Sequence, residues 1–150
     1  MLVGTICVRN VCCCDADTTA EQAAMMMRKA HVGDLVVVEA NAQGERVPVG
    51  IVTDRDLIVE VMAQKINPAA ITVGEFVMSD CLCVREDVPV FQAVEMMRKT
   101  GVRRLPVTND ADLLVGMVSI DDLIALIGRE LSGLAQVAAR QQGNEAAARG

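Results

Sequence analysis

Two short segments of the sequence carry a hydroxyl and a carboxylate at the same spacing. In each, a glycine and two apolar residues precede Thr53 or Ser119, and a carboxylate, Asp56 or Asp122, follows three positions later. A carboxylate there can accept hydrogen bonds from both hydroxyls of a ribose, and a helix N-terminus beside it offers free N–H groups to a phosphate. The same spacing is typical of a helix-capping box, so capping is the alternative interpretation. Because the pattern occurs twice, it favours a receptor for the sugar and phosphate of a nucleotide.

The two segments belong to a longer internal repeat. Residues 22–32 and 92–102 are identical at seven of 11 positions, at an offset of 70. Residues 49–58 and 115–124 are identical at six of 10 positions, at an offset of 66. The change of offset falls in polar, turn-like sequence around residues 41–46, where differences in length are tolerated. The chain therefore contains two copies of one structural unit.

Each unit is expected to fold as strand, helix, strand, strand and helix. Residues 18–22 have the composition of a capping box and predict the start of the first helix, and Pro89 suits the first turn of its counterpart. Apolar runs at 35–38 and 49–52 predict a β-hairpin, which the second unit repeats. Such strands indicate sheets covered on both faces, which one small unit cannot provide alone. The predicted fold is α/β (α+β), with two β-α-β-β-α repeats packed about a pseudo-twofold axis.

These residues resemble the signature of the cystathionine β-synthase (CBS) domain, whose tandem pair is called a Bateman module. The resemblance rests on residues 50–56 and 116–122, on the segment Leu105-Pro106-Val107 and on the helix over 93–99. It covers about residues 5–128, and the chain is therefore expected to be a stand-alone CBS pair.

The expected organisation has a first repeat over about residues 5–64, a linker over 65–74 and a second repeat over about 75–128. Residues 129–150 are expected to form a C-terminal helical extension, because an apolar stripe keeps helical spacing past the second repeat. Such a stripe needs a partner, either the N-terminal strand or a second subunit. It consists of Leu123, Ile127, Leu131, Leu134 and Ala138.

In the resemblance, two ligand sites lie between the repeats, and each is completed by the opposite half. The usual ligands of the family are AMP, ADP, ATP, NAD or S-adenosylmethionine, and AMP is the first candidate here. A strand over residues 81–83 would line the base pocket of the first site. The first and stronger site would contain Thr53, Arg55, Asp56, Cys81, Leu82, Arg103, Arg104, Leu105 and Pro106. The second and weaker site would contain Val11, Cys12, Ser119, Asp121 and Asp122.

The two sites are expected to differ in charge. Arg103 and Arg104 can meet a phosphate with bidentate hydrogen bonds at the first site, although a solvated turn would also explain them. The aligned residues of the first repeat are Gly33 and Asp34, and a carboxylate there would repel a phosphate. We therefore expect the first site to bind a phosphorylated ligand well and the second to bind it weakly.

The six cysteines allow a different interpretation. The sequence has no C-x-x-C and a single histidine, so the spacing of a tetrahedral zinc site is absent and no metal site is expected. Three adjacent cysteines on a strand, Cys12–Cys14, would point to alternating faces. The cysteines are therefore expected to be small buried apolar residues. The alternative is a thiol or metal redox sensor that uses Cys12–Cys14 with Cys81 and Cys83.

The composition argues against several classes of partner. A formal charge of −6, two phenylalanines and the absence of tyrosine and tryptophan argue against binding to nucleic acid. No segment approaches the roughly 20 consecutive apolar residues of a membrane helix, and the start of the chain lacks the basic region of a secretory signal. We expect a cytoplasmic protein with neither a membrane nor a nucleic-acid partner.

No nucleophile–base pair, metal triad or acid–base set is visible, so neither catalysis nor a catalytic cofactor is expected. The sequence predicts a regulatory sensor that binds an adenine nucleotide in the cleft between CBS repeats. It would signal through the shape of a homodimer or through a protein effector. The resemblance favours homodimers, and a twofold contact through the exposed helices is physically natural.

Overall fold

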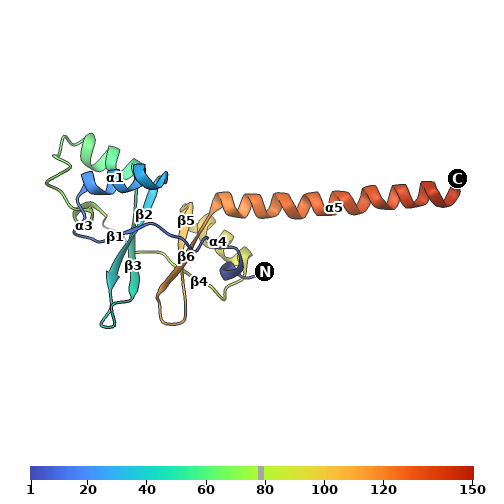
Figure 1. The fold of residues 1–150 in the computed structure, drawn as a ribbon, viewed down its shortest axis with the longest axis horizontal. Coiled ribbons are helices and arrows are strands. Elements are labelled where there is room, and N and C mark those ends of the chain that lie inside the picture. Colours follow the sequence, from blue (N-terminus) through green and yellow to red (C-terminus); the bar gives the residue numbers. More distant parts are fainter. Residues whose placement is uncertain (78–79) are drawn as a thin grey trace.

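The computed structural model describes residues 1–77 and 80–150, which form two halves with the same order of elements (Figure 1). The first half contains the 3-10 turn η1 (Val3–Thr5), β1 (Cys13–Cys14), α1 (Ala20–Ala30), β2 (Asp34–Ala40), β3 (Arg46–Thr53), α2 (Asp54–Asp56) and the π-helical η2 (Leu57–Met62). The second half contains α3 (Val73–Phe76), β4 (Val84–Arg85), α4 (Val90–Thr100), β5 (Arg104–Thr108), β6 (Leu114–Ser119) and α5 (Ile120–Arg149). The predicted α/β fold with two β-α-β-β-α repeats is confirmed.

Each half contains a three-stranded sheet of the same topology. The strand order is β1-β2-β3 in one sheet and β4-β5-β6 in the other, with the first pair parallel and the second pair antiparallel. A register shift interrupts the two hairpins at equivalent places, after Val37 and after Val107. Residues 81–83 precede β4 without regular secondary structure. The expectation of a strand over 81–83 is therefore wrong, because the pairing with β5 begins only at Val84.

The segment ahead of each sheet packs against the opposite half, and we call these two segments, η1 and α3, the arms. Val3 donates its N–H to the carbonyl of Val88 at 2.9 Å, and the equivalent Val73 donates to the carbonyl of Thr18 at 2.8 Å. Both valine side chains are fully buried, Val3 in the core of the second half and Val73 in the core of the first. Each half therefore completes the core of the other.

A glycine in each arm allows this close approach. The N–H groups of Gly4 and Gly74 donate to the carbonyls of Glu86 and Ala16, at 2.9 and 2.8 Å. A Cβ atom at Gly4 would lie 2.9 Å from the Cβ of Glu86, and one at Gly74 would lie 3.1 Å from the Cβ of Ala16. A side chain at Gly4 would therefore force the arm to shift, and one at Gly74 would make a tight contact that requires its neighbours to move by a few tenths of an ångström.

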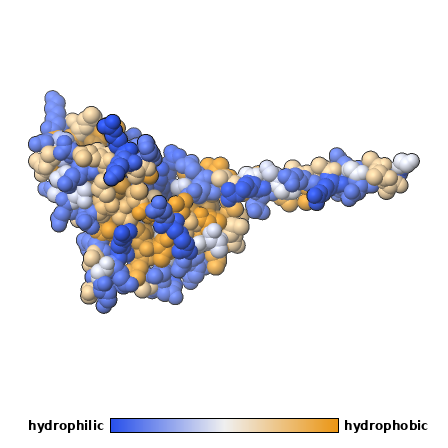
Figure 2. Space-filling model, viewed as in Figure 1, coloured by the Kyte–Doolittle hydropathy of each residue, from blue (hydrophilic) through white to orange (hydrophobic). Residues whose placement is uncertain are grey.

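The last helix leaves the body of the molecule. The first turns of α5 pack on the second half, and the later turns project away from it as one continuous helix (Figure 1). Apolar side chains interrupt the polar surface of this projection, with Leu131 and Leu134 exposed by 61% and 68% (Figure 2). The N-terminal segment does not cover them, because Val8 pairs with Met117 of β6. Among the described residues, no helix combines the length and the apolar character that a membrane crossing requires.

Candidate ligand-binding site

Both sequence motifs lie where a strand runs into a helix, β3 into α2 and β6 into α5. The N–H and the hydroxyl of Thr53 both donate to Asp56 Oδ2 at 2.8 Å, and the Asp56 N–H donates to Thr53 Oγ1 at 3.2 Å. Ser119 and Asp122 repeat the arrangement at 2.8, 2.6 and 3.2 Å. Both motifs are therefore capping boxes. Within the described part of the chain, Oδ1 of each aspartate accepts no hydrogen bond, so it remains open to a ligand hydroxyl.

The first motif borders a cavity of about 560 Å³ between the two halves. The first half contributes the end of β3 and the start of α2, and the second half contributes the segment before β4 and the start of β5. The lining residues are Ile51, Thr53, Asp54, Arg55, Asp80, Cys81, Leu82, Val102, Arg103 and Arg104. Small-molecule sites commonly enclose about 300–1,000 Å³. Six residues predicted for the first site therefore share one cavity of suitable size, namely Thr53, Arg55, Cys81, Leu82, Arg103 and Arg104.

Three residues predicted for the first site do not line this cavity. Asp56 is held by hydrogen bonds to Thr53, which does line it. Leu105 and Pro106 are fully buried, so their side chains belong to the interior.

Four residues that line the cavity were not predicted from the sequence. Ile51 could have been found, because it lies two positions before Thr53 on β3 and therefore on the same face of the strand. The other three have no such signal, since their position depends on how the halves meet: Asp54, Asp80 and Val102.

The residues predicted for the second site lie on the elements that correspond to those of the first. Ser119, Asp121 and Asp122 form the start of α5, with Asp121 exposed and the other two partly buried. Val11 and Cys12 precede β1 and are also partly buried. This set has the capping carboxylate of the first site, but no arginine is among its members.

The aligned residues Asp34 and Arg104 form an ion pair with each other. They begin β2 and β5, and Arg104 Nε lies 3.2 Å from Asp34 Oδ1. Asp34 is only 6% exposed, and its Oδ2 has no hydrogen-bond partner among the described residues. Burial raises the pKa of Asp34, the guanidinium of Arg104 opposes this shift, and the carboxylate of Asp54 adds to it. The sequence alignment associates Asp34 with the second site and Arg104 with the first site. In the structure, the Asp34 carboxylate compensates the charge of Arg104.

Arg103 and Arg55 are the other two arginines that line the cavity. Neither forms an ion pair within residues 1–77 and 80–150. Asp54 and Asp80 line the same cavity, so its potential is not uniformly positive.

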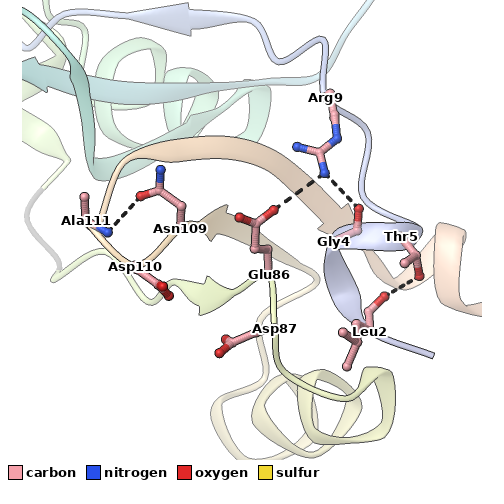
Figure 3. Close-up of a pocket in the computed structure, with 9 residues that line it drawn as sticks. All are labelled: Leu2, Gly4, Thr5, Arg9, Glu86, Asp87, Asn109, Asp110 and Ala111. Atoms are coloured by element: carbon pink, nitrogen blue, oxygen red, sulfur yellow. Dashed lines mark hydrogen bonds and ion pairs between the residues drawn. The ribbon is translucent and has the colours of Figure 1, made fainter.

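A second hollow of about 640 Å³ lies beside the first arm (Figure 3). Arg9 donates there to the Gly4 carbonyl at 3.1 Å and lies 3.6 Å from a carboxylate oxygen of Glu86. Glu86, Asp87 and Asp110 bring three carboxylates to its lining, which disfavours an anionic ligand. In the described ranges, no group of three or more His, Cys, Asp and Glu side chains could hold a metal ion.

Comparison with known families identifies the two halves. The model of the CBS domain matches residues 3–63 and, a second time, residues 73–129. The chain belongs to the CBS domain family. Each match begins at an arm, Val3 or Val73, so the family pattern includes the segment that packs on the opposite half. The resemblance to a tandem CBS pair is confirmed.

One relative is the uncharacterized protein MK0525 of Methanopyrus kandleri, which is 34% identical over 122 residues. The aligned part is 81% of this chain and 60% of the relative. The chain thus spans less than two thirds of the length of this relative, and the similarity concerns the CBS part alone.

Solved CBS pairs have the same fold. The CBS domain pair of protein MJ0100, in complex with 5′-methylthioadenosine and S-adenosyl-L-methionine, is 25% identical, with a TM-score of 0.73 over 87% of this chain and 98% of that chain. CBSX2 in complex with AMP is 21% identical, with a TM-score of 0.70 over 85% of this chain and 96% of that chain. The likeness to CBSX2 shows the fold alone.

Proposed function

We propose that this CBS pair is a regulatory module that binds an adenine nucleotide in the cavity between its halves. The observation that carries the proposal is the composition of the cavity wall. Thr53 and Arg55 come from one half, whereas Cys81, Arg103 and Arg104 come from the other. A ligand that touches both halves can favour one of their arrangements over another, and this difference is what a regulatory signal requires.

The side chains of the cavity suit the parts of a nucleotide. Asp56 does not itself line the cavity but is hydrogen-bonded to Thr53, which does, and its free Oδ1 would accept from the ribose hydroxyls. The Arg103 guanidinium would donate to the phosphate. Leu82 and Val102 provide apolar surface for a base. Arg104 forms an ion pair with Asp34 of the other half, so we propose that its main role is to join the two halves.

The charge of the cavity favours a phosphorylated adenine ligand, of which AMP is the first candidate. Three arginines line it, Arg55, Arg103 and Arg104, and a phosphate uses such charge whereas methylthioadenosine does not. The complex of the related MJ0100 pair with adenosine compounds supports the adenine class. ADP, ATP, NAD and S-adenosylmethionine remain in the set to be tested.

Calorimetry with AMP tests the proposal with two matched variants, Asp56→Ala and Asp122→Ala. Each removes the same capping box, so the loss of the helix cap is common to both. We expect Asp56→Ala to weaken AMP binding about tenfold and Asp122→Ala to leave the tighter binding event nearly unchanged. Equal losses would contradict the unequal sites, and the absence of binding by wild-type protein would overturn the proposal.

We further propose that the module acts without catalysis, in the cytoplasm, and transmits occupancy through a homodimer or a protein effector. Turnover of ATP by the pure chain would contradict the first of these statements. A thiol sensor is a second candidate because of one contact, which joins Cys81 to Cys83. A metal sensor lacks such support, since no suitable group of ligands is found in the described residues.

A further inference from the structure

Two thiols lie against each other at the wall of the cavity. The Cys83 thiol donates to Cys81 Sγ, with the two sulfur atoms 3.7 Å apart. Cys81 and the intervening Leu82 both line the cavity. The two cysteines are partly buried, and neither is in a disulfide. The two sulfur atoms are therefore near enough to bond after a small movement, and Cys81 is open to a small reagent that enters the cavity.

Only the second half carries this pair. The repeat offset of 70 places Val11 and Cys13 at the positions of Cys81 and Cys83. In the first half, the Cys13 thiol donates to the Val11 carbonyl at 3.5 Å instead. The shared fold therefore accepts valine where Cys81 stands, so the CBS fold does not require a thiol at that position.

The surroundings make Cys81 the more reactive of the two. The hydrogen bond from Cys83 lowers the pKa of Cys81, although burial opposes the shift, and the same bond raises the pKa of Cys83. By contrast, burial raises the pKa of Cys14 to about 11, so that thiol is protected.

We propose that Cys81 and Cys83 are a modification site at which a hydroperoxide forms a reversible disulfide, and that this disulfide weakens nucleotide binding in the cavity. The first part stands on the contact between the thiols alone. The second part rests on the proposed function, since it describes the regulation of the same site.

The chemistry balances with hydrogen peroxide as the oxidant. The Cys81 thiolate attacks one peroxide oxygen, the O–O bond breaks, and hydroxide leaves and takes a proton to become water, so Cys81 becomes a sulfenic acid. The Cys83 sulfur then attacks the Cys81 sulfur, the S–S bond forms, the S–O bond breaks, and the leaving hydroxide takes the Cys83 proton. Two thiols and one peroxide yield one disulfide and two waters, and a dithiol reductant reverses the change.

The disulfide would alter the wall that a nucleotide touches. An S–S bond is about 2.05 Å long, so the sulfur atoms must approach from their present separation of 3.7 Å. Leu82 lies between the two cysteines and must move with them. Because Cys81 itself lines the cavity, a bound nucleotide should in turn shield it from peroxide.

Tryptic mass mapping of the full chain tests the modification without any nucleotide. Cleavage after Lys65 and Arg85 leaves Cys81 and Cys83 as the only cysteines of peptide 66–85, and Cys12–Cys14 fall on peptide 10–28. After brief treatment with hydrogen peroxide, we expect peptide 66–85 to lose two hydrogens and to recover them with dithiothreitol. Oxidation of peptide 10–28 while peptide 66–85 stays reduced would overturn the proposal.

Two variants separate the roles of the sulfur atoms. Cys83→Ser should leave Cys81 as a sulfenic acid that a dimedone reagent captures, whereas Cys81→Val, which introduces the residue of the first half, should abolish the reaction of this peptide. Cys13→Ser, at the repeat position of Cys83, is the matched control and should leave disulfide formation unchanged. Equal loss of disulfide in Cys13→Ser would contradict the assignment.

Calorimetry with AMP on the reduced and oxidised protein tests the regulatory part. We expect about tenfold weaker binding after oxidation of the wild type and no change after the same treatment of Cys81→Val. Equal affinity of the two wild-type forms would overturn the regulation. A third outcome is that AMP binds neither form while peptide 66–85 still forms its disulfide. In that case the proposed function and the regulatory part would both fail, but the modification site would stand.

Discussion

Asp34 and Arg104 occupy the same position in the two repeats and carry opposite charges. The alignment assigns them to different sites, yet the structure joins them across the two halves at 3.2 Å. Removing the arginine would leave a carboxylate that is 6% exposed without its counter-charge. Buried ion pairs are costly to break from one side, because the remaining charge stays desolvated.

The first prediction concerns the stability of Arg104→Met. We expect the free energy of unfolding to fall by about 1–3 kcal/mol, a range reduced because Arg104 is partly exposed. Arg103→Met is the matched control and should change the stability by less than about 0.5 kcal/mol, since Arg103 is exposed and has no ion pair among the described residues. Urea unfolding measures both, and equal losses would show that the pair does not stabilise the fold.

The second prediction follows from the raised pKa of Asp34. A carboxyl whose pKa is raised on folding stabilises the fold at a pH below its ordinary value, and this contribution is lost as the pH rises through the pKa of the folded state. Arg104→Met raises the pKa of Asp34 further, because it removes the charge that opposes burial. The stability deficit of Arg104→Met should therefore be larger at about pH 7 than at about pH 4.5. A deficit that grows on acidification would contradict this account.

At the scale of elements, the two arms help to hold the halves together, because each packs on the opposite half. The strands and helices that follow the arms in the sequence could be predicted, because apolar runs indicate the strands and capping residues such as Thr19 and Thr53 mark where helices begin. The arms were not, since Val3-Gly4 and Val73-Gly74 give too short a match to identify a repeat. The burial of Leu105 and Pro106 was missed because their motif was assigned to the ligand.

The third prediction compares two glycines. Gly4→Ala places a Cβ 2.9 Å from the Glu86 Cβ and 3.0 Å from the Glu86 carbonyl oxygen, so the arm must shift. We expect a loss of about 1–3 kcal/mol in the free energy of unfolding. Gly133→Ala on α5 meets nothing within 4 Å, and there alanine should stabilise the helix by up to about 1 kcal/mol. The outcome that contradicts the arm's role is a Gly4→Ala protein as stable as the wild type.

At the scale of the whole molecule, large apolar side chains are exposed at equivalent places of both halves. Ile58 on η2 and Ile124 on α5 correspond to each other in the repeat and are exposed by 56% and 62%. Met25 and Met62 extend the first of these surfaces along a groove between α1 and η2. A twofold contact through these helices would cover the exposed side chains, which supports the proposed homodimer.

The fourth prediction concerns the assembly. Light scattering after size exclusion should give the mass of a dimer for the wild type, and the double variant Ile58→Glu, Ile124→Glu should raise the dissociation constant at least about tenfold. Leu134→Glu adds a charge further along α5 and should leave the mass unchanged. Dissociation by Leu134→Glu alone would instead locate the contact on the projecting part of α5.

The central claim is that the cavity between the halves holds the phosphorylated end of an adenine nucleotide. Its most direct measurement is the ratio of the affinities for AMP and adenosine in the wild type, in Arg103→Ala and in Arg9→Ala, which changes the hollow of Figure 3 instead. We expect AMP to bind the wild type and Arg9→Ala about tenfold or more tightly than adenosine, and Arg103→Ala to lose most of that preference. An unchanged ratio in Arg103→Ala would contradict the claim.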